Sequence, residues 1–231
     1  MKLTLFLLPL LAALPLTAAD NTASVPVTRE PHHHLILENQ YTRVYDVTVA
    51  PHESTLLHRH DNDYVAVVVS PSEIQSEVEG KPVTTGRAGL GEVRFVSAPI
   101  THRLTNTGDQ PFRNITIEIL NKKSPQANQP AADRGLDVGH GGMSDIVVDN
   151  TEVRVQEVQI APGGMLHKHT HKFPFLVVAI SDLDLHNMPQ GKPATMVHQK
   201  AGEVKWIGAG TTHEMMNMGK QQAHFIEVEF K

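Results

Sequence analysis

The chain repeats itself, and this repeat limits the folds it can adopt more than any other feature. A shift of 111 residues carries Asn39 onto Asn150, and with it the segment NQYTRVYDVTVAP onto NTEVRVQEVQIAP. The same shift carries GEVRFVSAPITHRLTN, which begins at Gly91, onto GEVKWIGAGTTHEMMN, which begins at Gly202. Self-similarity at a fixed period indicates repeated structural units. We therefore interpret the chain as two copies of one domain.

Each copy consists of short runs rich in Val, Ile and Thr, such as RVYDVTV, YVAVVVS, FLVVAIS and AHFIEVEF. Gly, Pro, Asn and Asp interrupt these runs at short intervals. This pattern is typical of antiparallel strands in a sandwich or barrel. No long stretch has helical periodicity. The sequence therefore predicts an all-β fold with two tandem barrels.

The first residues have the features of a secretory signal peptide. Lys2 precedes an apolar run, and small residues follow as far as Ala19, which predicts a signal peptide over residues 1–19. An uncleaved anchor is the alternative, although two prolines interrupt the run and it is short for a membrane span. Cleavage would give a periplasmic or secreted protein with no membrane attachment. The remaining predicted segments are an N-terminal arm (20–35), a first domain (36–120), a polar linker (121–146) and a second domain (147–231).

Composition excludes several classes of protein. The net charge is −5 and no basic run occurs, so a nucleic-acid partner is not expected. The chain has no cysteine, which excludes disulfides, a cysteine nucleophile and thiolate ligands. An exported protein without cysteine fits a bacterial periplasm better than a disulfide-rich extracellular module. Histidine is abundant, with 15 residues.

Three of these histidines recur in both copies, in the order His58, His60, His102 and His169, His171, His213. Alternate residues of a strand point to the same face, so each His-x-His pair can enter its barrel together. Three converging imidazoles bind a divalent metal and leave positions open for water or substrate. Exposed or core histidines are the alternative. We predict metal binding in at least one of the two copies, with Fe2+, Mn2+, Cu2+ and Zn2+ all left open.

These motifs resemble those of the cupin superfamily. The first cupin motif, G-x5-H-x-H-x3-4-E-x6-G, is similar to PHESTLLHRHDNDYVAVVVS and PGGMLHKHTHKFPFLVVAIS. The second, G-x5-P-x-G-x2-H-x3-N, is similar to the two segments that begin at Gly91 and Gly202, with a looser Pro-x-Gly turn. The resemblance covers most of residues 36–120 and 147–231. It implies two tandem cupin barrels of the double-stranded β-helix or jelly-roll type, that is, a bicupin.

The sequence departs from the cupin pattern at the position of the usual glutamate ligand. Tyr64 and Phe175 stand there, so both sites are predicted to use three histidines. Tyr64 is a candidate catalytic residue, as a weak ligand or proton donor, with a packing aromatic as the alternative. Asp61 and Asp63 lie nearby and are the alternative source of a carboxylate ligand, but both are expected to point away from the His60 face.

His167 has no counterpart in the first copy, because Leu56 occupies that position. On a regular strand it would share a face with His169, so it is a candidate fourth ligand, catalytic base or surface residue. We expect the histidines of Pro31–His34 to be solvated, with an adventitious metal-scavenging arm as the alternative, and place them in no site. Glu118 and Glu229 alternate with apolar residues on the last strand, which predicts an outward, solvated face.

The resemblance implies a small-molecule substrate. A carboxylate-free site makes the metal a stronger Lewis acid and favours an anionic substrate. Three-histidine cupin sites resemble those of dioxygenases, so a metal-dependent oxidoreductase acting on a small organic acid, diketone or phenolic compound is the first hypothesis. A lyase or isomerase acting on a sugar-like compound and a non-catalytic binding protein are the alternatives. A homodimer is compatible with the sequence, which does not indicate which copy is active.

Overall fold

The computed structural model describes residues 23–120 and 140–231. The predicted signal peptide, residues 1–19, and residues 121–139 of the predicted linker lie outside these ranges. Within them the chain forms β-strands and one short 3-10 helix, η1 (Val27–Arg29). No helix in the described ranges is long and apolar enough to cross a bilayer.

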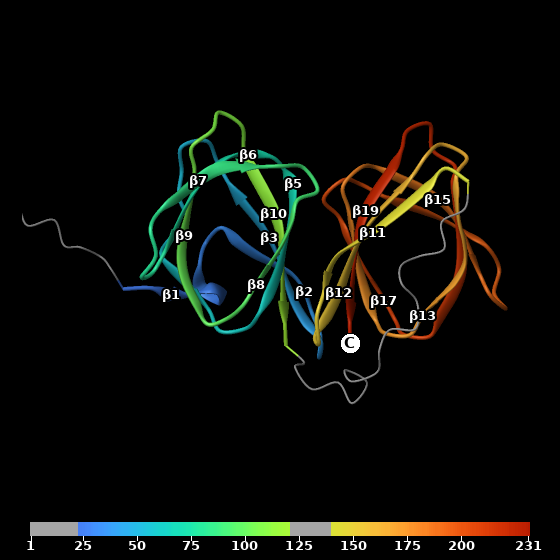
Figure 1. Ribbon diagram of the computed structural model, residues 1–231, viewed down its shortest axis with the longest axis horizontal. Helices are drawn as coiled ribbons and strands as arrows, with labels where there is room; N and C mark the ends of the chain where they lie inside the picture. Colours follow the sequence, from blue (N-terminus) through green and yellow to red (C-terminus); the bar gives the residue numbers. More distant parts are fainter. Residues whose placement is uncertain (1–22, 121–139) are drawn as a thin grey trace, which may run out of the picture.

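Two five-stranded sheets form the first domain as a jelly roll (Figure 1). One sheet has the order β1 (Val25–Pro26), β4 (His58–His60), β9 (Ile100–Asn106), β6 (Ser72–Val78), β7 (Thr84–Ala88). The other has the order β2 (His33–Glu38), β3 (Thr42–Val49), β10 (Phe112–Ile119), β5 (Tyr64–Ser70), β8 (Val93–Val96).

The second domain repeats this arrangement. One sheet has the order β11 (Gly142–Asp149), β12 (Val153–Ile160), β19 (Ala223–Phe230), β14 (Phe175–Ala179), β17 (Val204–Ile207). The other has the order β13 (Met165–His171), β18 (Thr211–Asn217), β15 (Leu183–Pro189), β16 (Thr195–Gln199). The prediction of an all-β fold with two tandem jelly-roll barrels is confirmed.

The structural repeat begins earlier than the sequence comparison indicated. Part of the segment predicted as an arm forms β1 and the start of β2, which pair with β4 and β3. β11 pairs with β12 as β2 pairs with β3, and both ladders shift register, between Leu35 and Leu37 and between Ile146 and Val148. By the same shift of 111 residues, Ser144 of β11 is therefore the equivalent of His33 of β2.

The two domains share a hydrophobic core. Figure 1 shows the sheet that contains β3 and β10 beside the sheet that contains β12 and β19. Their facing side chains form one buried cluster that includes Val44, Ile117, Val155 and Val228. Since each sheet thus has a barrel on one face and a partner domain on the other, both faces of its strands are buried.

This double burial reverses one prediction. The apolar residues of β10 and β19, such as Ile117 and Val228, face the other domain. The alternate residues then face the barrel interior. Glu118 is 1% exposed and Glu229 is 7% exposed, so the expected solvated face for these carboxylates is wrong.

Two turn glycines lie against the opposite domain. Gly202 has φ +80, and a Cβ there would lie 2.2 Å from Nη1 of Arg113. Gly91 has φ +76, and a Cβ there would lie 2.9 Å from Cε1 of His224. Glycine is favoured at positive φ because it has no Cβ. The Gly-Glu-Val segments found by sequence comparison therefore form turns that the domain interface also requires.

Candidate metal centres

The first site lies inside the first domain, where β4 and β9 run side by side. β4 carries His58 and His60, each 1% exposed, and His102 of β9 pairs directly with His58. The ring centroid of His102 lies 4.4 Å from that of His58 and 5.4 Å from that of His60. The structure therefore brings together the three histidines predicted for this domain.

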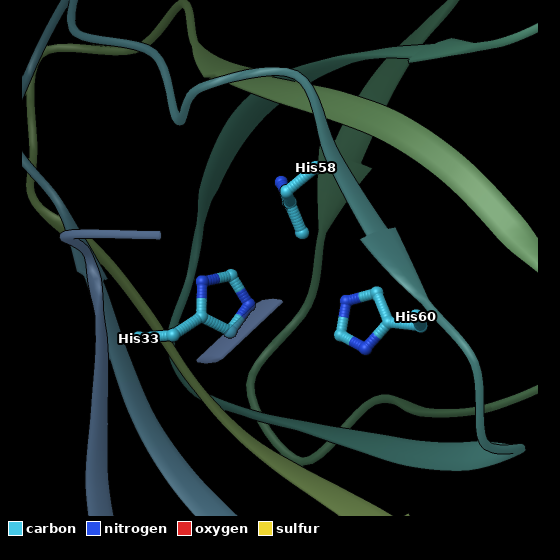
Figure 2. Close-up of side chains that lie close together, drawn as sticks. All are labelled: His33, His58 and His60. Atoms are coloured by element: carbon cyan, nitrogen blue, oxygen red, sulfur yellow. The ribbon is translucent and has the colours of Figure 1, made fainter. Parts of the chain in front are cut away.

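A fourth imidazole joins them from β2. The ring centroid of His33 lies 4.7 Å from that of His58 and 5.7 Å from that of His60. One ring nitrogen of each of these three residues lies within 4.8 Å of the other two, and Figure 2 shows their rings facing one space. The expectation that no histidine of Pro31–His34 belongs to a site is wrong for His33. We call the four histidines site one.

His33 is held by a buried carboxylate. Oε2 of Glu30 lies 2.6 Å from Nδ1 of His33, and it also accepts a hydrogen bond from the backbone N–H of His32 at 2.9 Å. Oε1 accepts one from the backbone N–H of Leu56 at 3.0 Å. Burial alone would raise the pKa of Glu30, but these bonds and the nearby imidazoles lower it to about 2. Glu30 is therefore ionised and directs the proton of His33 to Nδ1.

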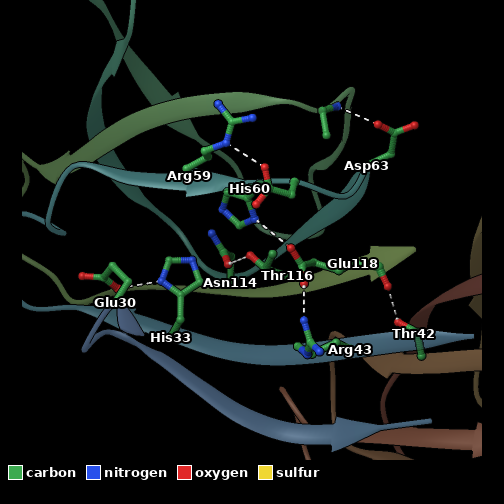
Figure 3. A network of polar contacts seen from close by, with 12 residues as sticks. Glu30, His33, Thr42, Arg43, Arg59, His60, Asp63, Asn114, Thr116 and Glu118 are labelled. Atoms are coloured by element: carbon green, nitrogen blue, oxygen red, sulfur yellow. Dashed lines mark hydrogen bonds and ion pairs between the residues drawn. The ribbon is translucent and has the colours of Figure 1, made fainter. Parts of the chain in front are cut away.

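A second carboxylate stands behind His60. Oε1 of Glu118 lies 3.4 Å from Nδ1 of His60, and Oε2 accepts a hydrogen bond from Nη1 of Arg43 at 3.3 Å (Figure 3). Across the site, Nδ1 of His58 donates to the carbonyl of Leu56 at 2.9 Å. The acceptor at Leu56 fixes the tautomer of His58 and leaves its Nε2 as the free ligand atom.

The state of these rings fits a divalent metal. Burial, reinforced by the neighbouring rings, lowers the pKa of His58 to about 3 and that of His102 to about 2. Both are therefore neutral near pH 7, which is the form that binds metals. Among the described residues, Nε2 of His58 and Nε2 of His102 are buried without a hydrogen-bond partner. A metal ion would satisfy both nitrogens.

Site two comprises His169, His171 and His213 in the second domain. One ring nitrogen of each lies within 4.8 Å of the other two, and the Nε2 atoms of His169 and His171 are 3.1 Å apart. Burial lowers the pKa of His213 to about 3, and its Nε2 is buried without a partner among the described residues. This site also fits a divalent metal.

Each imidazole of site two is held through Nδ1. The acceptors are the carbonyl of His167 at 2.7 Å, Oε1 of Glu229 at 3.0 Å and Oδ1 of Asn187 at 2.7 Å, for His169, His171 and His213 respectively. Burial alone would lower the pKa of His171, but the bond to Glu229 and the nearby Glu227 raise it. Site two thus has three nitrogens where site one has four.

The position of the usual glutamate ligand is aromatic in both domains. Tyr64 is buried, and its ring centroid lies 4.4 Å from that of His60. Phe175 stacks on His171, with centroids 3.9 Å apart and an interplanar angle of 19°. Burial raises the pKa of Tyr64, so its hydroxyl stays protonated near neutral pH. Its proposed catalytic role stays a prediction.

The structure does not bring the other candidates into a site. A register shift between Leu166 and His169 interrupts β13, and the His167 side chain is exposed. Asp61 accepts a hydrogen bond from Arg59 at the surface. Asp63 accepts one from the backbone N–H of Ala98. Regular alternation along β13, on which the His167 prediction depended, does not hold.

A cavity adjoins each site. The first has a volume of about 190 Å³, and its walls include Val68, Ile74, Leu104 and Phe112 besides the four histidines and Tyr64. The second has a volume of about 120 Å³. Glu227, which is fully buried, lines the second cavity beside His213. The sequence comparison missed Glu227, because the corresponding residue of the first copy is Thr116.

Comparison with known proteins supports this description. No family model matches the chain. Over 88 residues the chain is 34% identical to the β-alanine degradation protein BauB of Pseudomonas aeruginosa. The matched segment covers 37% of this chain and 90% of BauB.

Several solved structures share the fold at low identity. An oxalate decarboxylase of Lactobacillus farciminis in complex with formate has a TM-score of 0.62 at 15% identity, covering 87% of this chain and 84% of that one. A Bacillus subtilis oxalate decarboxylase variant has a TM-score of 0.61 at 13% identity, covering 86% and 75%. AerE of Microcystis aeruginosa has a TM-score of 0.57 at 14% identity, covering 87% and 98%. With its two jelly-roll domains and a histidine group in each, the chain belongs to the cupin superfamily as a bicupin with metal-binding sites.

Proposed function

We propose that this bicupin is a metal-dependent oxidoreductase of the dioxygenase type that acts in site one on a small carboxylate, diketone or phenolic compound. The observation that carries the proposal is a set of four imidazoles that lines a mainly apolar cavity of about 190 Å³. A redox-active divalent ion bound there would supply Lewis acidity and electron transfer to dioxygen.

The charge of the site supports an anionic substrate. No carboxylate belongs to the histidine group itself, so a bound ion would keep its full double charge. Arg94 lines the first cavity and Lys205 lines the second, at positions related by the repeat. Arg94 is exposed, and its Nη2 lies 2.6 Å from Oε1 of Glu92. A substrate anion would therefore compete with Glu92 for the guanidinium group of Arg94. A cation at the same place in both domains supports recognition of a carboxylate, because charge-assisted hydrogen bonds are strong.

The cavity walls favour a substrate with an apolar body over a sugar. Aliphatic and aromatic side chains dominate the lining, and Thr55, Ser76, Asn114 and Thr116 are its uncharged polar members besides Tyr64. A sugar would leave hydroxyl groups without partners there, which is unfavourable in a buried site. In this proposal the Tyr64 hydroxyl donates a proton to a substrate oxygen, which the short distance between its ring and that of His60 supports.

Oxygen consumption tests the proposal. The purified chain would be loaded separately with Fe2+, Mn2+, Cu2+ and Zn2+ and assayed with diketones, hydroxy acids, catechols, oxalate and β-alanine. The last two follow from the names of the similar proteins. We expect substrate-dependent oxygen uptake that His58→Ala/His60→Ala abolishes and His169→Ala/His171→Ala does not. Turnover without oxygen uptake would favour a lyase or decarboxylase. Metal binding without turnover of any compound would favour a binding protein.

A further inference from the structure

We propose that His33 is a fourth metal ligand of site one, held in place by Glu30, and that it makes site one bind divalent metal more tightly than site two. This inference rests on the metal binding assumed in the proposed function. The two sites share the repeated histidine motifs, and the fourth ligand is the proposed difference between them.

The geometry places His33 among the ligands rather than beside them. Its ring nitrogen lies within 4.8 Å of those of His58 and His60, the same limit within which the three ligand nitrogens of site two lie of one another. Its side chain is 5% exposed. His33 and His102 each lie beside His58, at 4.7 and 4.4 Å between ring centroids, and all four histidines line the same cavity.

The Glu30–His33 pair resembles the carboxylate–histidine pairs that hold metal ligands. The Glu30 side chain is 0% exposed, and each of its oxygens accepts a backbone hydrogen bond. Burial of an ionised carboxylate is unfavourable unless it is fully hydrogen-bonded. Its contact with Nδ1 of His33 at 2.6 Å places the proton there and leaves Nε2 with a lone pair. The site thereby gains a basic, oriented nitrogen.

The second domain shows that the fold does not require a histidine at the position of His33. Ser144 occupies the corresponding position, and its hydroxyl lies 3.5 Å from Oε1 of Gln156. The strand pairing is the same in both domains, since His33 pairs with Val47 as Ser144 pairs with Val158. This barrel therefore closes without a histidine at that place. Folding alone does not explain why the first domain has one.

The test measures Co2+ binding to site one alone. In a chain that carries His169→Ala/His171→Ala, Co2+ affinity would be determined by competition with a chelator, and the bound ion would be followed by visible absorption. His33→Ser introduces the residue of the second domain, and circular dichroism would check its folding. His33→Gln is the second variant if the serine variant does not fold. His34→Ser is the matched control, because His34 is the exposed neighbour on the same strand.

We expect His33→Ser to weaken Co2+ binding by about 100-fold and to change the absorption spectrum, because a ligand is lost. Glu30→Gln should weaken binding by about 10-fold, within the roughly 10–100-fold typical when a partner of a ligand is lost. His34→Ser should change neither quantity. In the converse background, His58→Ala/His60→Ala, site two should bind Co2+ more weakly than site one.

Two results would overturn the inference. If His33→Ser matches His34→Ser in affinity and spectrum, His33 does not bind the metal. If affinity falls but the spectrum stays that of the parent chain, His33 only supports the other histidines. If Co2+ binds neither to the chain that carries only His169→Ala/His171→Ala nor to the chain that carries only His58→Ala/His60→Ala, the metal binding on which the proposed function rests is refuted instead.

Discussion

Glu227 is a buried acid whose ionisation should control the stability of the metal-free protein. It is 0% exposed, and neither carboxylate oxygen has a hydrogen-bond partner among the described residues. Burial raises its pKa from 4.5 to about 7, with His171 opposing the shift and Glu229 adding to it. Between these two values the folded chain keeps a proton that the unfolded chain has lost.

The magnitude follows from the pKa difference. Because its pKa is raised in the folded state, the stability that Glu227 contributes is fully present below about pH 4.5 and is lost as the pH rises to about 7. At about 1.4 kcal/mol for each pKa unit, the loss due to Glu227 is about 3 kcal/mol. Glu227→Gln removes the charge but keeps the shape. Any cost of burying the amide is independent of pH, so it cancels in a comparison between two pH values.

The assay is urea unfolding of wild type and Glu227→Gln in the presence of a chelator, at pH 4.5 and pH 8. The lowered pKa values of His58, His102 and His213 make stability fall as the pH falls, which is the opposite sign, whereas the raised pKa of His171 acts in the same direction as that of Glu227. The quantity to compare is therefore the difference between the two proteins. We expect the free energy of unfolding of Glu227→Gln, taken relative to that of wild type, to be about 3 kcal/mol higher at pH 8 than at pH 4.5. An equal difference at both pH values would refute the assignment of a raised pKa to Glu227.

Three further predictions follow from the two sites and the interface. The variants His58→Ala/His60→Ala and His169→Ala/His171→Ala should each remove about one metal per chain by elemental analysis, and full retention would show that the corresponding site is misassigned. Ile117→Ala should lower the free energy of unfolding by about 2–5 kcal/mol, because it leaves a cavity in the core that the domains share; a loss below about 1 kcal/mol in urea would contradict that packing. In the Glu227→Gln background, stability should fall as the pH drops below 6.5, since the folded pKa of His58 is about 3 and that of His213 is also about 3. A flat profile in chelator would mean that these rings are not buried as neutral groups.

The repeat made the sequence informative about the fold and about six histidines. Two copies with matching His-x-His segments and matching third histidines cannot arise from a general excess of histidine. Strand alternation then placed both members of each pair on one face. The structure confirms the fold, and it brings together the histidines predicted for each domain.

Predictions of side-chain direction from alternate positions along a strand failed where the strand had two buried faces or a bulge. Glu118 and Glu229 alternate with apolar residues, which predicts an exposed face only if one side of the sheet meets water. The domain interface covers that side, so the carboxylates turn inward toward His60 and His171. His167 was misplaced for the related reason that one register shift exchanges the faces of a strand.

The sequence by itself determined two β-barrels with a histidine pair and a third histidine in each, because local periodicity and an internal repeat are properties of the chain alone. Only the tertiary structure decided that His33 joins the first site and that Glu30 and Glu227 are buried. These residues recur in no motif, and their positions depend on which strands pair across the barrel. Such pairing brings together segments far apart in sequence, which no local pattern specifies.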